Sequence, residues 1–130
     1  MNTVIKSIAV LLVVSILMSF APVSFATEGG VPEMKEYGFV DCGDVKIEYG
    51  IYGNLSGEPL LLLPPNGGDM HSLDGSILPE MSKHFKVITV SVRGTGNSDW
   101  VDGTMNFETM SDDLVKLLDY LKIEKTNIFR

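Results

Sequence analysis

Short apolar runs alternate with polar segments along the chain, and their lengths and spacing predict strands and helices. Residues 60–63 are four consecutive leucines, and residues 86–92 are rich in β-branched side chains. Strands without a polar face are typical of parallel sheets that helices cover on both sides. Between these runs, residues 72–84 place apolar side chains at helical spacing, although Pro79 favours a short helix or a late start. The pattern predicts a strand–turn–helix–strand unit.

Further segments extend this unit in both directions. Residues 39–41 and 45–49 alternate apolar and polar side chains around a turn at residues 42–44, which predicts an antiparallel hairpin with one solvated face. Apolar side chains recur at helical spacing over residues 107–121, and residues 126–129 begin another strand. The predicted fold class is therefore α/β, with an antiparallel hairpin followed by parallel strands and flanking helices.

The amino end has the features of a signal peptide, which we assign to residues 1–26. Lys6 supplies a short positive segment, residues 7–20 form an apolar core, and Ser24 and Ala26 place small side chains at a cleavage site. The core is shorter than the roughly 20 residues that span a bilayer, although an uncleaved signal anchor is the alternative. We therefore expect a secreted protein or one on the exterior of the cell envelope.

The rest of the chain is expected to contain one folded domain. Residues 27–36 are polar and rich in glycine, which predicts a flexible linker, and residues 37–130 would form the domain. Without residues 1–26 the chain has nine Lys and Arg against 17 Asp and Glu, a formal charge of −8. Such a balance disfavours nucleic-acid binding and is expected mainly to maintain solubility. Membrane contact is expected only through an uncleaved signal segment.

Metal and cysteine chemistry have little support in the sequence. Cys42 is the only cysteine, which excludes an internal disulfide and a cysteine zinc site, and we expect its thiol to be inert. Asp69 and Asp74 lie near His71, but no compact set of metal ligands is present, and helix capping is the expected role of the two carboxylates. No metal and no cofactor are predicted.

Two turns follow the two buried strands, at the sheet edge where ligands bind in open α/β sheets. The first, Asn66-Gly67-Gly68, is suited to an oxyanion hole, because glycine lets the backbone N–H groups approach a developing negative charge. The same residues are also ordinary turn formers. The second turn contains Gly94-Thr95-Gly96, but it lacks the third glycine of a dinucleotide-binding turn, which disfavours a nucleotide site.

Several polar side chains near these turns have alternative roles. His71 is either a surface residue or a substrate contact at the mouth of the site, and His84 is expected at the surface. Ser98 is expected to use its hydroxyl to bond the backbone of its turn. Arg93 is expected to tie the turn to neighbouring carbonyls or carboxylates.

In its order of elements and turns, the chain resembles the amino-terminal half of an α/β-hydrolase. The most specific feature is the Arg-Gly-x-Gly-x-Ser turn at residues 93–98, supported by the Asp-Asp-Leu segment at residues 112–114. The resemblance implies a mostly parallel, eight-stranded sheet and a Ser, Asp, His triad whose nucleophile lies in a Gly-x-Ser-x-Gly elbow after the fifth strand. Residues 126–129 resemble that fifth strand. The chain would therefore be a fragment truncated before the elbow, without any triad residue.

The resemblance also implies roles for the first turn. The backbone N–H of Asn66 would be an oxyanion-hole donor, and Gly67, Gly68 and His71 would line the site. The chain departs from the family pattern at residues 64–65, where two prolines replace the usual His-Gly, and at Ser91, where the family usually has Asp.

The resemblance predicts the following function. The full-length form would hydrolyse an ester or similar acyl bond of a small molecule through a serine nucleophile, and the present chain would be inactive. The alternatives are a non-catalytic, exported binding protein that uses the same sheet edge, and a flavodoxin-like nucleotide binder, which the missing phosphate turn disfavours.

Overall fold

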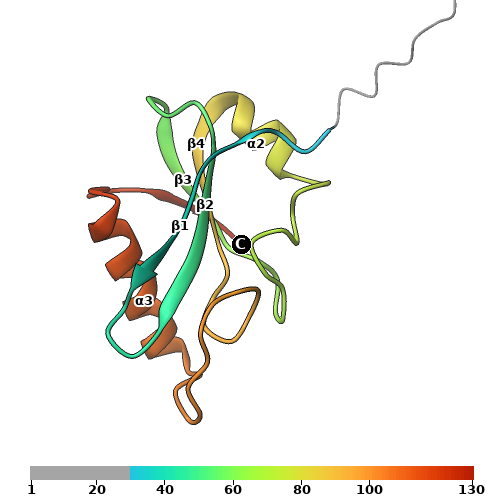
Figure 1. The fold of residues 1–130 in the computed structure, drawn as a ribbon. Helices are drawn as coiled ribbons and strands as arrows, with labels where there is room; N and C mark the ends of the chain where they lie inside the picture. Colours follow the sequence, from blue (N-terminus) through green and yellow to red (C-terminus); the bar gives the residue numbers. More distant parts are fainter. Residues whose placement is uncertain (1–29) are drawn as a thin grey trace, which may run out of the picture.

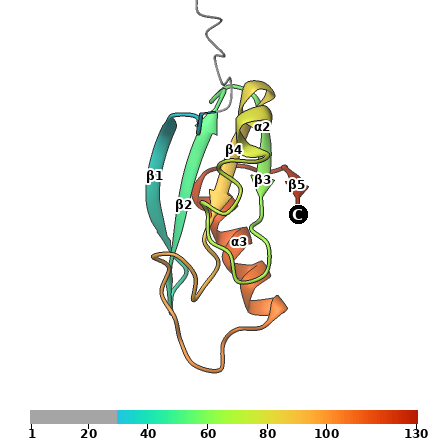
Figure 2. The same ribbon diagram turned by 90° about the vertical axis from the view of Figure 1, so that its right-hand side faces the viewer.

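The computed structural model describes residues 30–130, whose strands form one mixed sheet in the order β1-β2-β4-β3-β5 (Figures 1 and 2). Its elements are β1 (Met34–Asp41), β2 (Lys46–Gly53), β3 (Glu58–Leu62), α2 (Leu78–His84), β4 (Phe85–Val90), α3 (Phe107–Tyr120) and β5 (Asn127–Phe129). The β1–β2 and β2–β4 pairs are antiparallel, whereas β3 pairs in parallel with β4 and β5. The predicted α/β class is confirmed. The predicted signal peptide lies outside the described residues.

Helices α2 and α3 cover opposite faces of the sheet (Figure 1). Leu61 of β3 packs in the cluster that contains Leu117 of α3. Its neighbours Leu60 and Leu62 pack in the cluster that contains Leu78 of α2. Successive strand side chains point to opposite faces, so a strand between two helical layers needs apolar residues at every position. The four-leucine run is explained in this way. No helix between residues 30 and 130 has the length and apolar character needed to cross a membrane.

The first strand begins earlier than the sequence predicted. Residues 34–36, the last part of the predicted linker over residues 27–36, belong to β1, so the linker prediction is wrong there. Met34 pairs with Tyr52 of β2, and the Tyr49 hydroxyl donates a hydrogen bond of 2.8 Å to Glu36. Lys35 and Glu36, the polar residues of this stretch, are exposed on an edge strand whose other side is free, so water can solvate them.

Helix α2 starts late, as Pro79 indicated. It runs from Leu78 to His84 and has the proline in its first turn, where the missing N–H has no helical partner to lose. The residues before it form successive turns, closed by bonds from Ser72 N to the Asp69 carbonyl and from Asp74 N to the His71 carbonyl, each of 3.1 Å. The loop between β3 and α2 therefore contains the first turn, Asn66-Gly67-Gly68, as well as these later turns.

Replacing Gly53 by alanine tests the contact between the end of β2 and the α2–β4 junction. Gly53 has a φ of +80°, and a Cβ there would press on the carbonyl oxygens of Ser82 and Phe85. The left-handed backbone costs about 1–2 kcal/mol for a residue with a Cβ, and crowding against backbone about 1–3 kcal/mol more. We expect Gly53→Ala to lower the free energy of unfolding, measured by urea denaturation, by about 3 kcal/mol.

Gly103→Ala is the matched control. Gly103 has a φ of +76°, but no atom lies within 4 Å of the added Cβ. We expect it to cost only the backbone part, about 1–2 kcal/mol. Equal losses in the two variants would contradict the crowding at Gly53.

Candidate functional site

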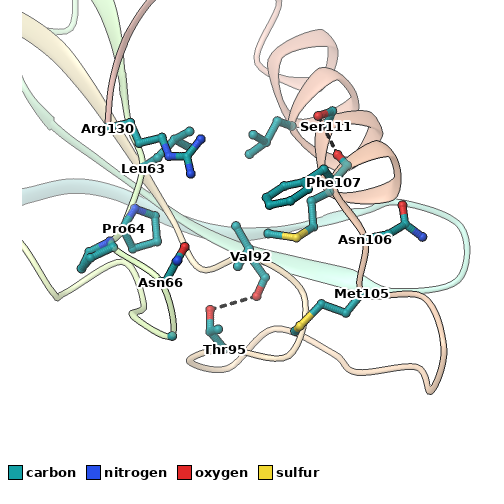
Figure 3. A pocket seen from close by; sticks show the side chains of 14 residues that line it. Leu63, Pro64, Asn66, Val92, Thr95, Met105, Asn106, Phe107, Ser111 and Arg130 are labelled. Carbon is teal, nitrogen blue, oxygen red and sulfur yellow. Dashed lines mark hydrogen bonds between the residues drawn. The ribbon is translucent and has the colours of Figure 1, made fainter.

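An open cavity of about 430 Å³ lies at the carboxyl ends of β3 and β4, beside the start of α3 (Figure 3). Figure 3 shows Leu63, Pro64 and Arg130 on one side of it, and Phe107 and Ser111 of α3 on the other. Most of the lining side chains are apolar. The lining residues are Leu63, Pro64, Pro65, Asn66, Gly67, Val92, Thr95, Met105, Asn106, Phe107, Met110, Ser111, Leu114 and Arg130.

The turn after β3 forms one wall of this cavity. Gly68 N donates to the Pro65 carbonyl at 2.8 Å, which closes a four-residue turn with Asn66 at its second position. Gly67 at the third position has a φ of +76°, a conformation that type II turns require and glycine adopts without strain. Within residues 30–130 the N–H of Asn66 donates to no protein acceptor. A residue that lines the cavity therefore keeps a backbone donor without a protein partner in the described part of the chain.

The structure brings only two of the four predicted site residues to the cavity. Asn66 and Gly67 line it, whereas Gly68 and His71 do not. Gly68 packs against Ser72. The His71 side chain is half exposed, and its Nδ1 lies 2.8 Å from a carboxylate oxygen of Asp74. His84 is exposed on α2 beside Glu80, as expected for a surface residue.

The expected capping role of Asp69 and Asp74 is wrong. The N-cap of α2 is Ile77, which makes no capping side-chain bond, because the helix begins several residues after both aspartates. Asp69 instead accepts a 3.0 Å bond from His71 N, and Asp74 contacts the His71 ring. Among the described residues, no group of three or more His, Cys, Asp or Glu side chains is arranged to hold a metal ion.

Arg93 anchors the second turn, as predicted. Its guanidinium donates to both carboxylate oxygens of Asp113 on α3, at 2.8 and 2.9 Å, and to both oxygens of Asp44, at 3.1 and 3.3 Å. Arg93 and Asp113 are 1% and 3% exposed. The hydrogen bond from Arg93 lowers the pKa of the Asp44 carboxyl. The planar guanidinium of Arg93 thus links the second turn to the hairpin through Asp44 and to α3 through Asp113.

Ser98 bonds the backbone, as predicted. Its hydroxyl donates to the Ser91 carbonyl at 2.6 Å and accepts from Glu48 N at 2.8 Å. Asp99 bonds the same strand, because its carboxylate accepts from Lys46 N and its N–H donates to the Lys46 carbonyl. The second turn therefore lies along the start of β2.

Glu48 is the residue of this region that the sequence reasoning missed. Strict alternation over residues 45–49 placed it on a solvated face, but it is 1% exposed, because the second turn covers that face of β2. The prediction of one solvated hairpin face is therefore wrong for β2. Burial raises the pKa of the Glu48 carboxyl, but hydrogen bonds from Asn97, Ser91 and Tyr37 outweigh it and hold the pKa below its ordinary value.

Cys42 lies under α3, away from the cavity. It is buried, and burial, together with the Asp113 carboxylate, raises the pKa of its thiol to about 11. Nearly all of the thiol is then protonated at neutral pH, which supports the predicted inertness, because the thiolate is the reactive form.

Solved structures similar to this chain include several hydrolases, whereas no protein-family profile matches it. A hydrolase from Pseudomonas aeruginosa is 25% identical, covering 72% of this chain and 36% of that one, with a TM-score of 0.67. The enol-lactonase from Burkholderia xenovorans LB400 is 30% identical over 72% and 35%, with a TM-score of 0.61. The Cif epoxide hydrolase from Acinetobacter nosocomialis is 21% identical over 66% and 26%, with a TM-score of 0.58.

The chain spans about a third of the length of these structures, or less. Residues 30–130 contain the hairpin, the parallel strands β4, β3 and β5, and the turns at the carboxyl ends of β3 and β4. The fold resemblance that the sequence indicated is confirmed. The described part of this chain is the amino-terminal part of an α/β-hydrolase fold.

Proposed function

We propose that this chain is the amino-terminal part of an exported hydrolase that cleaves an ester or similar acyl bond of a small molecule. The serine nucleophile and the rest of the triad would come from sequence beyond Arg130, and residues 1–130 alone would not turn over substrate. No cofactor takes part in this proposal.

One observation carries the proposal. Asn66 lies in a turn at the carboxyl end of β3, on the wall of an apolar cavity, and its N–H has no acceptor among residues 30–130. A backbone donor held in a closed turn needs no reorganisation when charge develops on a substrate oxygen, which is the condition for effective oxyanion stabilisation. Hydrolases among the structural neighbours support the same class of reaction.

The proposed chemistry gives Asn66 a defined step. The serine hydroxyl would attack the acyl carbon and lose its proton to the histidine base, and the carbonyl π-electrons would move onto oxygen. The Asn66 N–H would donate to that oxyanion. The electrons then return to the carbonyl as the histidine gives its proton to the leaving alcohol. In a second cycle, water loses a proton to the same histidine, attacks the acyl carbon and releases the acid, and the serine regains its proton.

The test compares p-nitrophenyl acetate hydrolysis by two proteins, the 130-residue chain and the product of the same reading frame extended past Arg130. We expect the longer protein to hydrolyse the ester and a serine-directed inhibitor to block it. We expect the 130-residue chain to match buffer. Turnover by the 130-residue chain that resists such inhibitors would contradict the proposal.

A cheaper observation addresses the same point. The elbow directly follows the fifth strand in this fold, so the nucleotide sequence should encode Gly-x-Ser-x-Gly within about ten codons of Arg130. A reading frame without that motif would overturn the serine mechanism. Ligand binding without turnover in the longer protein would instead favour the non-catalytic binding protein.

A further inference from the structure

Glu48 is a buried carboxylate whose hydrogen-bond partners are all neutral. It accepts from the Tyr37 hydroxyl at 2.8 Å, from the Ser91 hydroxyl at 2.8 Å, and from the backbone and side-chain nitrogens of Asn97 at 2.9 and 2.8 Å. Within residues 30–130 it forms no ion pair. Burying an unpaired charge is costly unless hydrogen bonds compensate it, so these four donors are what maintain the anion.

Ser91 connects this anion to the first turn. Its hydroxyl donates to Oε2 of Glu48 and accepts a 3.1 Å bond from the backbone N–H of Met70. The carboxylate can only accept, so it fixes the direction of the Ser91 proton and leaves the oxygen lone pairs facing Met70. The bond to Met70 therefore depends on the charge state of Glu48 as well as on Ser91.

Within residues 30–130, two backbone N–H groups join the segment that contains the oxyanion turn to other parts of the fold, and Met70 supplies one of them. At one end of that segment, Leu63 N donates to the Phe129 carbonyl at 2.9 Å. At the other end, Met70 is 2% exposed and bonds Ser91. The residues between these anchors include Asn66, whose N–H must be placed accurately to serve a developing oxyanion.

We propose that Glu48 and Ser91 are positioning residues for the Asn66–Gly68 turn, acting through the Met70 N–H. The same carboxylate holds Asn97, so one buried anion fixes both turns at this sheet edge relative to each other. The inference rests on the proposed function, because accurate positioning of this turn matters only if the turn binds an oxyanion.

The test is amide hydrogen exchange at Met70 in the purified full chain. Ser91→Ala removes the acceptor, and Glu48→Gln puts an NH₂ group where the carboxylate accepts, so that it competes for the Ser91 lone pairs. We expect each variant to speed Met70 exchange by about tenfold, the effect of losing one such hydrogen bond. Exchange at Val87 and Ile88, which are fully buried in β4, reports global opening and is used to normalise each rate.

Tyr37→Phe is the matched control. The Tyr37 hydroxyl donates to Oε1 of Glu48, whereas the Ser91 hydroxyl donates to Oε2. This variant therefore removes one donor from the same carboxylate but keeps the hydrogen bonds that join Glu48 to Ser91 and Ser91 to Met70. We expect Met70 exchange to stay within about twofold of the unmodified chain. Ser82→Ala, which removes a hydroxyl bond to the Pro79 carbonyl in α2, controls for loss of any serine hydroxyl.

Two results would overturn the inference. One is unchanged Met70 exchange in both Ser91→Ala and Glu48→Gln, and the other is an equal increase in Tyr37→Phe. If Glu48→Gln loses protection against amide exchange throughout β4, it is globally destabilised, and the Met70 exchange rate in Ser91→Ala then decides the inference. Exchange is measured without turnover, so a failed ester assay with the longer protein would refute the proposed function and leave this result standing.

Discussion

Replacing Arg93 by alanine is expected to lower the free energy of unfolding of the chain by about 3–5 kcal/mol, measured by urea denaturation. The variant leaves the Asp113 carboxylate, which is 3% exposed, without the guanidinium that bonds both of its oxygens. A buried charge without a partner is far more costly than a lost surface ion pair. Because small domains are stable by only about 5–15 kcal/mol, this one change should bring the fold close to unfolding.

Two comparisons make the Arg93 result specific. Asp44 bonds the same guanidinium, but its side chain is 47% exposed, so Asp44→Asn should lower the free energy of unfolding far less than Arg93→Ala does. The double variant Arg93→Ala with Asp113→Ala removes the stranded charge and should be more stable than Arg93→Ala alone. A loss below about 1 kcal/mol in Arg93→Ala would contradict the buried pair as the anchor of this turn.

If the extended protein is active as proposed, replacing Asn66 by proline in it is expected to reduce kcat by about 10²–10³-fold, the cost of losing one oxyanion-hole donor. Proline lacks the backbone N–H but is favoured at the second position of such a turn, where its fixed φ fits. The substitution should therefore remove the donor while the Pro65–Gly68 bond still closes the turn. Steady-state hydrolysis of p-nitrophenyl acetate gives kcat and KM separately.

Asn66→Ala separates the backbone from the side chain. It keeps the N–H and removes only the carboxamide, so we expect kcat within about threefold of the unmodified protein, because no transition-state donor is lost. Equal losses in the two variants would assign the effect to the side chain or to the shape of the turn. Full activity in Asn66→Pro would exclude this N–H as an oxyanion donor.

The architecture could be predicted because the side-chain pattern within each strand shows which of its faces are buried. Residues 60–63 have no polar face, which indicates helices on both sides, and residues 86–92 are rich in β-branched side chains. Helices α2 and α3 cover those two sides. Pro79 indicated the late start of α2 for an equally local reason. Arg93 and Ser98 were assigned correctly because turn residues beside buried strands satisfy nearby carboxylates and backbone groups.

The parts that could not be predicted depend on contacts between distant segments. Alternation within β2 shows that Glu48 differs from its neighbours, but not that the second turn covers it. Met34 is recognisable as a strand residue only once its pairing with Tyr52 is known. His71 follows the first turn closely in sequence, yet the chain turns away from the cavity before reaching it.

The bonds between the second turn and β2 also have a kinetic consequence. They join residues 49 to 53 positions apart, so the loop that they close contains most of β2 and all of β3, α2 and β4. Closing long loops is entropically costly before the contacts they bring together form, which slows folding. The site edge should therefore acquire its shape late in folding, after the sheet that supports it.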